Sequence, residues 1–146
     1  MVPGYINDHS NPYTDIIFNF IKVNDYNKLT TLLLNEGKKV NLLEMKDVKM
    51  FTVLAFASYK NTEECLTLLY THALENNLRE EAGSTVEEKK KTLSLWVNAP
   101  TDEGFTAIHF GTYHGNYAIL KFLTEVAMAN INVKNKFGST VLHVAA

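Results

Sequence analysis

The chain of 146 residues is poor in cysteine and arginine and has neither a long apolar run nor an excess of one charge. A single cysteine, Cys65, excludes an internal disulfide and any zinc site built from several cysteines. No apolar stretch approaches the roughly 18 residues of a membrane-spanning helix, so we expect no membrane insertion by this segment. The formal net charge of −2 leaves no basic stripe, which argues against nucleic-acid binding.

The motifs of common active sites are missing too. The sequence has no glycine-rich phosphate loop, no nucleophile elbow and no histidine pair at the spacing of zinc-binding helices. His109 and His114 are five residues apart, and no third ligand accompanies them. The adjacent acids Asp102 and Glu103 are typical of a solvated turn rather than of a catalytic carboxylate pair. We therefore predict no catalytic residue, no metal ligand and no cofactor.

The first residues, MVPGYINDHSNPY, lack the basic and apolar regions of a secretory signal. Together with the single cysteine, this favours a reducing location inside the cell. We expect the protein on the cytoplasmic side, either free or tethered to a membrane by downstream segments.

One short pattern occurs twice. Residues 104–115 read GFTAIHFGTYHG, and residues 138–146 read GSTVLHVAA. The Gly, Thr and His of both segments align at an offset of 34 residues, which lies in the period range of stacked repeats. An enzyme rarely carries one catalytic histidine twice at a repeat spacing, so we interpret His109 and His143 as structural residues.

The segment from Gly104 onwards predicts a compact helical unit. Gly104 suits a turn with positive φ, and Thr106 suits the N-cap of a short helix from Ala107 to about Tyr113. Gly115 is typical of the residue that ends such a helix. Residues 117–127 place apolar side chains three and four positions apart, which predicts a second helix.

This order of turn, short helix, corner and second helix resembles the ankyrin repeat over residues 101–146. The usual proline after the threonine is replaced by Ala107 and Val141, which removes a rigid first residue but leaves the cap in place. The resemblance implies an all-α ankyrin-repeat solenoid of stacked helix-turn-helix units with short hairpin loops. It also implies that the histidine hydrogen-bonds near the threonine and to the neighbouring hairpin.

We predict one ankyrin-repeat domain that spans residues 1–146. Its parts are an N-terminal capping repeat (13–46), a second repeat (47–98), a third repeat (99–133) and the start of a truncated fourth repeat (134–146). In the second repeat Ala55 occupies the histidine position. Thr52 and Thr106 are 54 positions apart, about 21 more than one repeat needs.

The extra residues predict a helical insertion at about 75–96. The second helix of that repeat would run long, turn at Gly83 and give way to a new helix that returns to Trp96. Residues 84–88, STVEE, contain two overlapping capping boxes, which favours a helix start there.

A helix that stopped at Ala146 would expose Val141, Leu142 and Val144. Stacked repeats are stable only through their neighbours. We therefore expect the natural protein to continue into further ankyrin repeats; the alternative is that another chain covers this end.

Ankyrin-type surfaces bind partners through the hairpin tips and the exposed side of the short helices. The corresponding candidate residues are Val48, Lys49, Phe51, Tyr59, Lys60, Asp102, Glu103, Phe105, Tyr113, His114, Lys136 and Phe137. Their aromatic members fall in matching rows on one concave side, and aromatic side chains are favoured anchors of interfaces. The alternative is that some of them pack between adjacent hairpins.

The resemblance favours a protein-protein interaction module with a protein partner of unknown identity. The long insertion and the segments NAPTDEGFTAIHFGTYHGN and NKFGSTVLHVAA are also similar to the N-terminal ankyrin regions of protist DHHC-type palmitoyltransferases. This suggests, as an alternative, a regulatory or substrate-recruiting region of a larger acyltransferase. Catalysis in that family depends on a Cys-rich segment between membrane helices, which this chain lacks, so no catalytic residue carries over.

Overall fold

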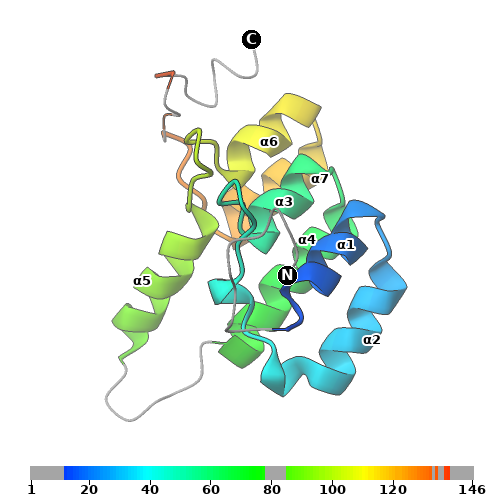
Figure 1. The fold of residues 1–146 in the computed structure, drawn as a ribbon. Coiled ribbons are helices and arrows are strands. Elements are labelled where there is room, and N and C mark those ends of the chain that lie inside the picture. The colour runs from blue at the N-terminus through cyan, green and yellow to red at the C-terminus, as the bar shows by residue number, and fades with distance from the viewer. Residues whose placement is uncertain (1–11, 78–84, 133, 135–136, 139–146) are drawn as a thin grey trace.

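The computed structural model describes residues 12–77, 85–132, 134 and 137–138, and the regular structure in these residues is helical. Helices pair into two layers (Figure 1). The inner layer contains α1 (Thr14–Lys22), α3 (Val53–Tyr59) and α6 (Ala107–His114), and the outer layer contains α2 (Tyr26–Glu36), α4 (Glu63–His72) and α7 (Tyr117–Lys121). This arrangement confirms the predicted all-α stack of helix pairs.

Short helical segments extend or connect these pairs. They are the 3-10 turns η1 (Gly37–Lys39) and η2 (Leu42–Glu44) and the π-helical segments η3 (Ala73–Asn77) and η4 (Phe122–Val126). The segment η3 continues α4, as the prediction of a long second helix requires. The segment η4 continues α7 with wider turns than the regular helix that we expected over 117–127. In the described ranges, no helix is long and apolar enough to cross a membrane.

The corner between the helices of each pair has the same backbone geometry. It is formed by Asn24, Asn61 and Gly115, with φ angles of 55°, 58° and 64°. This left-handed conformation ends a helix, and glycine and asparagine adopt it at the lowest cost. The chain therefore turns back in the same way in each pair, which lets successive pairs stack in register.

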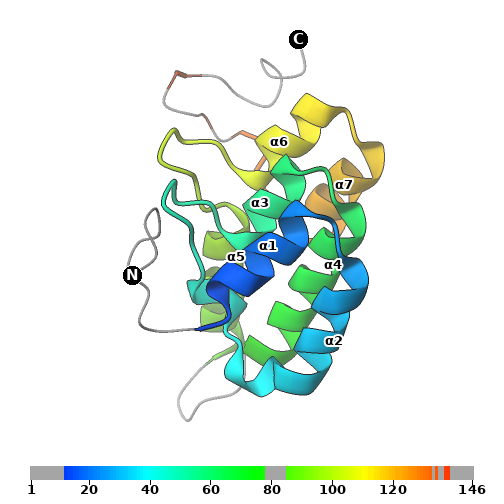
Figure 2. The ribbon, with the colours of Figure 1, turned by 45° about the vertical axis from the view of Figure 1, so that its right-hand side comes forward.

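A hairpin precedes each of the inner helices α3 and α6, and a matching turn residue follows at Gly138. The tip residues Met50, Gly104 and Gly138 have φ angles of 67°, 82° and 78°. Figure 2 shows the two complete hairpins extending to the same side of the inner layer. The hairpins and the inner helices therefore meet at an angle.

A single side chain braces each hairpin from within. One carboxylate oxygen of Asp47 accepts from the backbone N–H groups two and four residues later, both at 2.9 Å. The hydroxyl of Thr101 accepts from the corresponding N–H groups of the second hairpin, both at 3.3 Å. Both turns are therefore held by hydrogen bonds within the hairpin itself.

The core lies between the two layers. The inner helices contribute Ile17, Leu54 and Ile108 from equivalent positions, each at most 1% exposed. The outer helices contribute fully buried side chains as well, namely Leu29, Leu66, Leu69, Ile119 and Leu123. Burial of each of these side chains stabilises the fold by roughly 1.5–3 kcal/mol.

Gly111 permits the closest approach of α6 to α7. A Cβ atom at this position would lie 2.9 Å from the Cγ2 methyl of the buried Ile119, closer than real Cβ contacts. The absence of a side chain at Gly111 therefore lets α6 pack directly against α7.

His109 has the structural position that the sequence predicts. It is 1% exposed, and its Nδ1 accepts a hydrogen bond of 3.0 Å from the backbone N–H of Thr106 at the start of α6. Thr106 and His109 thus form a capping box at the start of α6. In the second pair, where Ala55 holds the histidine position, the hydroxyl of Thr52 caps α3 by accepting from the N–H of Ala55 at 3.0 Å. Residues 139–146, with His143 and most of the predicted fourth repeat, lie outside the described residues.

Hydrogen bonds join the second helix pair to the third along their whole edge. They run from Asp102 N–H to Lys49 C=O (2.9 Å), from Ser58 hydroxyl to Ala107 C=O (2.6 Å), between His114 Nε2 and Tyr59 C=O (2.6 Å) and from Asn116 to Asn61 amide (2.8 Å). The pairs are therefore held in one fixed relative position at the hairpins, the helices and the corners.

The insertion forms α5 (Val86–Val97), which stands apart from the two layers in Figure 1. The hydroxyl of Thr85 accepts from the N–H of Glu88 at 3.1 Å and starts the helix, as one of the two predicted capping boxes indicated. Only the last turn is buried, with Trp96 and Val97 at 4% and 2% exposed. Gly83 lies outside the described residues.

Candidate partner-binding groove

A groove of about 650 Å³ lies in the angle between the hairpin tips and the inner helices. Of the candidate partner-binding residues, those on its walls are Val48, Lys49, Phe51, Tyr59, Lys60, Asp102, Glu103 and Phe105. The groove continues into a second hollow of about 520 Å³, which Tyr113 and His114 line together with Tyr59, Lys60 and Phe105. The structure therefore brings these candidates together on one surface.

The last two candidates come from the predicted fourth repeat. Phe137 is 66% exposed, and its ring centroid lies 6.4 Å from that of Phe105. It therefore extends the same surface. Lys136 lies outside the described residues.

The floor of the groove is a continuous set of aromatic rings that crosses all described helix pairs. We call it the aromatic ribbon; its members are Phe18, Phe51, Phe56, Tyr59, Phe105, Phe110 and Phe137. Neighbouring ring centroids in the ribbon are 5.2 to 6.4 Å apart. These separations are typical of favourable aromatic pairs, so the rings fix one another in place.

The rings of the ribbon differ in their exposure. Phe51 stacks on Phe110 at an interplanar angle of 18° and is half-buried, and Phe105 is half-buried against Phe110. Tyr59 is 44% exposed, and Tyr113, beside the ribbon, is 75% exposed. The alternative of packing between hairpins thus applies in part to the two phenylalanines, whereas the tyrosines face solvent.

Several residues of the groove were not predicted from the sequence. They are Phe18, Asn19, Lys22, Asp47, Phe56, Thr101 and Phe110. Phe110 lies in α6, and its ring packs on Phe51 and Phe105 of the hairpins instead of in the space between the layers. A signal was present, because Phe56 and Phe110 each stand five residues before the corner residue of their pair.

Charged side chains border the ribbon on two sides. Asp47, Asp102 and Glu103 lie on the hairpins, together with Lys49, whereas Lys22 lies at the end of α1. The ion pairs found among the described residues, Lys28–Asp25 and Lys39–Glu36, lie elsewhere. Asp102 and Glu103, which form no ion pair with another described residue, are thus available to a partner.

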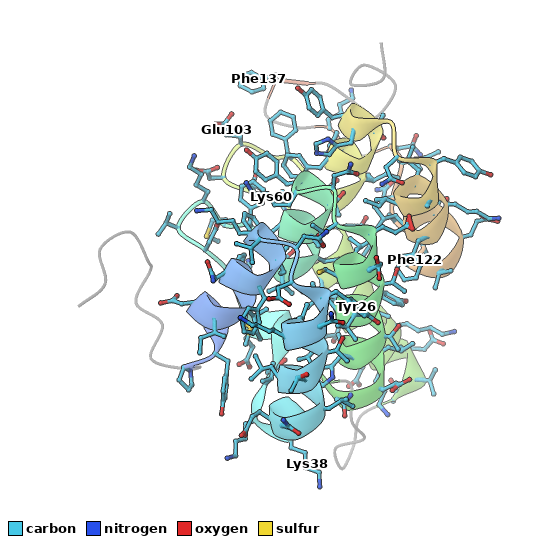
Figure 3. All side chains as sticks on the ribbon, turned by 90° about the vertical axis from the view of Figure 1, so that its right-hand side faces the viewer. Tyr26, Lys38, Lys60, Glu103, Phe122 and Phe137 are labelled. Carbon is cyan, nitrogen blue, oxygen red and sulfur yellow. The ribbon has the colours of Figure 1, made fainter. Side chains whose placement is uncertain are left out.

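Lys60 occupies a position above the ribbon. Its Nζ lies 5.3 Å from the ring centroid of Tyr59 and 5.8 Å from that of Phe56. An ammonium group over an aromatic face is attracted by the ring quadrupole. Figure 3 shows Lys60, Glu103 and Phe137 on the same side of the molecule, with Phe122 of the outer layer on another.

The buried thiol of Cys65 lies outside the groove. Burial raises the pKa of Cys65, more than the hydrogen bond from Thr62 lowers it. A raised pKa disfavours the thiolate, which is the nucleophilic form of cysteine. Among the described residues, no group of three or more His, Cys, Asp and Glu side chains is arranged to hold a metal ion.

His72, at the end of α4, is buried beside the turn at Gly37. Burial lowers the pKa of His72, and the Gly37 backbone and the charge of Glu75 oppose that shift less strongly. The unfolded chain therefore takes up a proton near the ordinary pKa of about 6.5, and the folded chain does so only at lower pH. The contribution of neutral His72 to stability is fully present above the unfolded-state pKa of about 6.5. It is lost as the pH falls from there through the folded-state pKa.

We predict that His72→Gln reduces the pH dependence of stability on the acidic side. The free energy of unfolding of the parent protein, measured by urea titration at pH 7.5, 6.5 and 5.5, should fall as the pH falls. The fall should be smaller for His72→Gln, because glutamine binds no proton in either state. Equal slopes for both proteins would mean that His72 titrates alike in the folded and unfolded chains.

Two comparisons with known proteins agree with this fold. Residues 54–124 match the family model described as "Ankyrin repeats (many copies)". A chain of the crystal structure of the yeast ribosomal protein Rps3 in complex with its chaperone Yar1 superimposes with a TM-score of 0.72. The match covers 90% of this chain and 81% of that chain at 20% sequence identity, which supports a shared fold. The repeated helix pairs and the capped inner helices agree with the family match, so the chain contains ankyrin repeats over residues 54–124.

Proposed function

We propose that this chain is a protein-interaction module that binds a partner protein through the groove between the hairpin tips and the inner helices. The observation that carries the proposal is the aromatic ribbon, which gathers rings from successive helix pairs on one open surface. Aromatic side chains in such hollows supply most of the binding energy of many protein interfaces.

The preformed shape of the groove supports the proposal. Asp47 and Thr101 brace the hairpins from within, and the hydrogen bond from Asp102 N–H to Lys49 C=O fixes one hairpin against the other. A surface that is already ordered loses little conformational entropy on binding. The interface can therefore form without rearrangement of the stack.

A pair of matched tyrosines tests the proposal. Tyr113 lines the groove and is 75% exposed, whereas Tyr117 starts α7, outside the groove, and is 74% exposed. A photo-crosslinking amino acid at position 113 should capture a specific protein from a lysate of the native organism. The same amino acid at position 117 should not capture that protein. Equal capture at both positions, or capture at 117 alone, would contradict a binding surface in the groove.

The alternative, a regulatory or substrate-recruiting region of a larger membrane-bound DHHC-type acyltransferase, remains a prediction. Neither the family match nor the matched crystal structure concerns an acyltransferase.

A further inference from the structure

The charges beside the aromatic ribbon are divided between two opposite edges. The hairpin edge carries the carboxylates of Asp47, Asp102 and Glu103 and, among the described residues, the ammonium of Lys49. The helix edge carries Lys22 and Lys60 and no carboxylate among the groove residues of the inner helices. The groove is thus acidic on the hairpin side and basic on the helix side, with an apolar floor between the two.

From this charge pattern, and resting on the proposed function, we infer the chemistry of the partner. We propose that the groove selects a protein segment that places an apolar side chain on the aromatic ribbon, Arg or Lys side chains toward the hairpin tips, and carboxylates toward Lys22 and Lys60. A segment of one charge throughout meets like charges at one edge, and such contacts discriminate against it.

The position of Lys60 determines which side of the groove the cations of the bound segment face. Its ammonium already lies over the faces of Tyr59 and Phe56. A cation of the partner would therefore be repelled from that side, although the rings alone would attract it. On the hairpin side Asp102 and Glu103 are exposed, and neither forms an ion pair with another described residue. A guanidinium or ammonium group of the partner is accordingly best placed at the hairpin tips.

The charged side chains of both edges lie at the rim of the groove, where salt weakens their effect on the association rate and the affinity. Exposed charges are screened by salt over a distance of about 10 Å at 0.1 M ionic strength. Their contribution should therefore be largest at low salt and should act on the association rate as well as on the affinity.

The test begins with a random peptide library displayed on phage and selected against the purified chain. Peptides that bind the groove are identified by loss of binding to the variant Phe105→Ala/Tyr113→Ala. These peptides should be enriched in sequences with an apolar or aromatic anchor flanked by Arg or Lys on one side and by Asp or Glu on the other.

Charge reversal then tests each edge separately. The variants Asp102→Lys/Glu103→Lys and Lys22→Glu should each raise the Kd of the selected peptides by about tenfold or more at low salt, and by less at high salt. A peptide with Asp or Glu in place of its Arg or Lys should regain affinity for Asp102→Lys/Glu103→Lys. For Asp102→Lys/Glu103→Lys, the matched control Glu44→Lys/Glu125→Lys makes the same change in net charge at exposed residues outside the groove and should leave the Kd unchanged.

The outcomes separate this inference from the proposed function. Groove-binding peptides without the charge pattern, or with equal affinity for both charge-reversed variants and the control, would overturn the inferred partner chemistry and leave the interaction module intact. A selection in which binding never depends on Phe105 and Tyr113 would overturn both.

Discussion

Replacing His109 with alanine should lower the free energy of unfolding by about 2–4 kcal/mol, a large part of the 5–15 kcal/mol of an ordinary domain. His109 is buried, and its ring accepts the backbone N–H of Thr106. The alanine variant would leave that N–H without its acceptor and would open a cavity between the hairpin and α6. Each of these changes is destabilising alone.

His114, in the same helix, provides the matched control. It is exposed, although its Nε2 lies 2.6 Å from the backbone oxygen of Tyr59. His114→Ala should therefore cost no more than about 1 kcal/mol, the usual contribution of an exposed hydrogen bond. Urea or thermal unfolding followed by circular dichroism gives both values.

The second helix pair shows what would contradict this account of His109. That pair has Ala55 at the equivalent position, and Thr52 alone caps its helix. If His109→Ala were as stable as the parent protein, the Thr106 half of the capping box alone would suffice for α6, and the histidine would be dispensable for the fold. A change in stability on adding a chelator would point to a metal role for the histidine instead.

The second large effect concerns binding. The double variant Phe105→Ala/Tyr113→Ala should raise the Kd for the partner captured at position 113 by about 10²-fold or more. Truncation of an interface anchor commonly costs 2 kcal/mol or more of binding free energy. Both residues line the same hollow beside Phe110. Isothermal titration calorimetry of the purified pair measures the loss.

Stability must be measured alongside, since Phe105 packs on Phe110 and His109. Tyr113 is largely exposed, so Tyr113→Ala alone should retain the parent unfolding midpoint while it still weakens binding. Tyr117→Ala has the same chemical change and nearly the same exposure and should bind as the parent does. Unchanged affinity of a folded double variant would exclude the groove as the binding surface.

Local signals in the sequence predicted much of the fold. Thr106 and Gly115 mark the ends of the helix that the structure places at Ala107–His114, one residue longer than predicted. Such residues act within a few positions of themselves, through a side-chain cap or a left-handed backbone, so one sequence suffices to recognise them. The division into repeats and their boundaries remains a prediction.

The residues whose roles could not be predicted from the sequence acquire those roles through contacts between distant segments. Phe110 has the spacing of a core residue, and only the position of the hairpin shows that it belongs to the groove. Met50 adopts a φ of 67° that asparagine or glycine would signal but methionine does not. Asp47 and Thr101 brace equivalent turns with different chemical groups, so their shared role is invisible in the repeat pattern.

The charge pattern of the groove escaped prediction for the same reason. Lys22 belongs to the first helix pair, whereas Asp102 and Glu103 belong to the hairpin before α6, and their sequence separation is large. Stacking brings them to opposite sides of one aromatic floor. The proposed selectivity of the surface therefore depends on the stacking of the helix pairs and not on any single pair.

Hydrogen-deuterium exchange of the chain with and without its captured partner tests the central claim most directly. The account predicts that the partner slows exchange of the backbone amides in the hairpins, residues 47–51 and 101–105, and at the exposed ends of α3 and α6. Slower exchange confined to the outer helices α2, α4 and α7, with the hairpins unchanged, would contradict it.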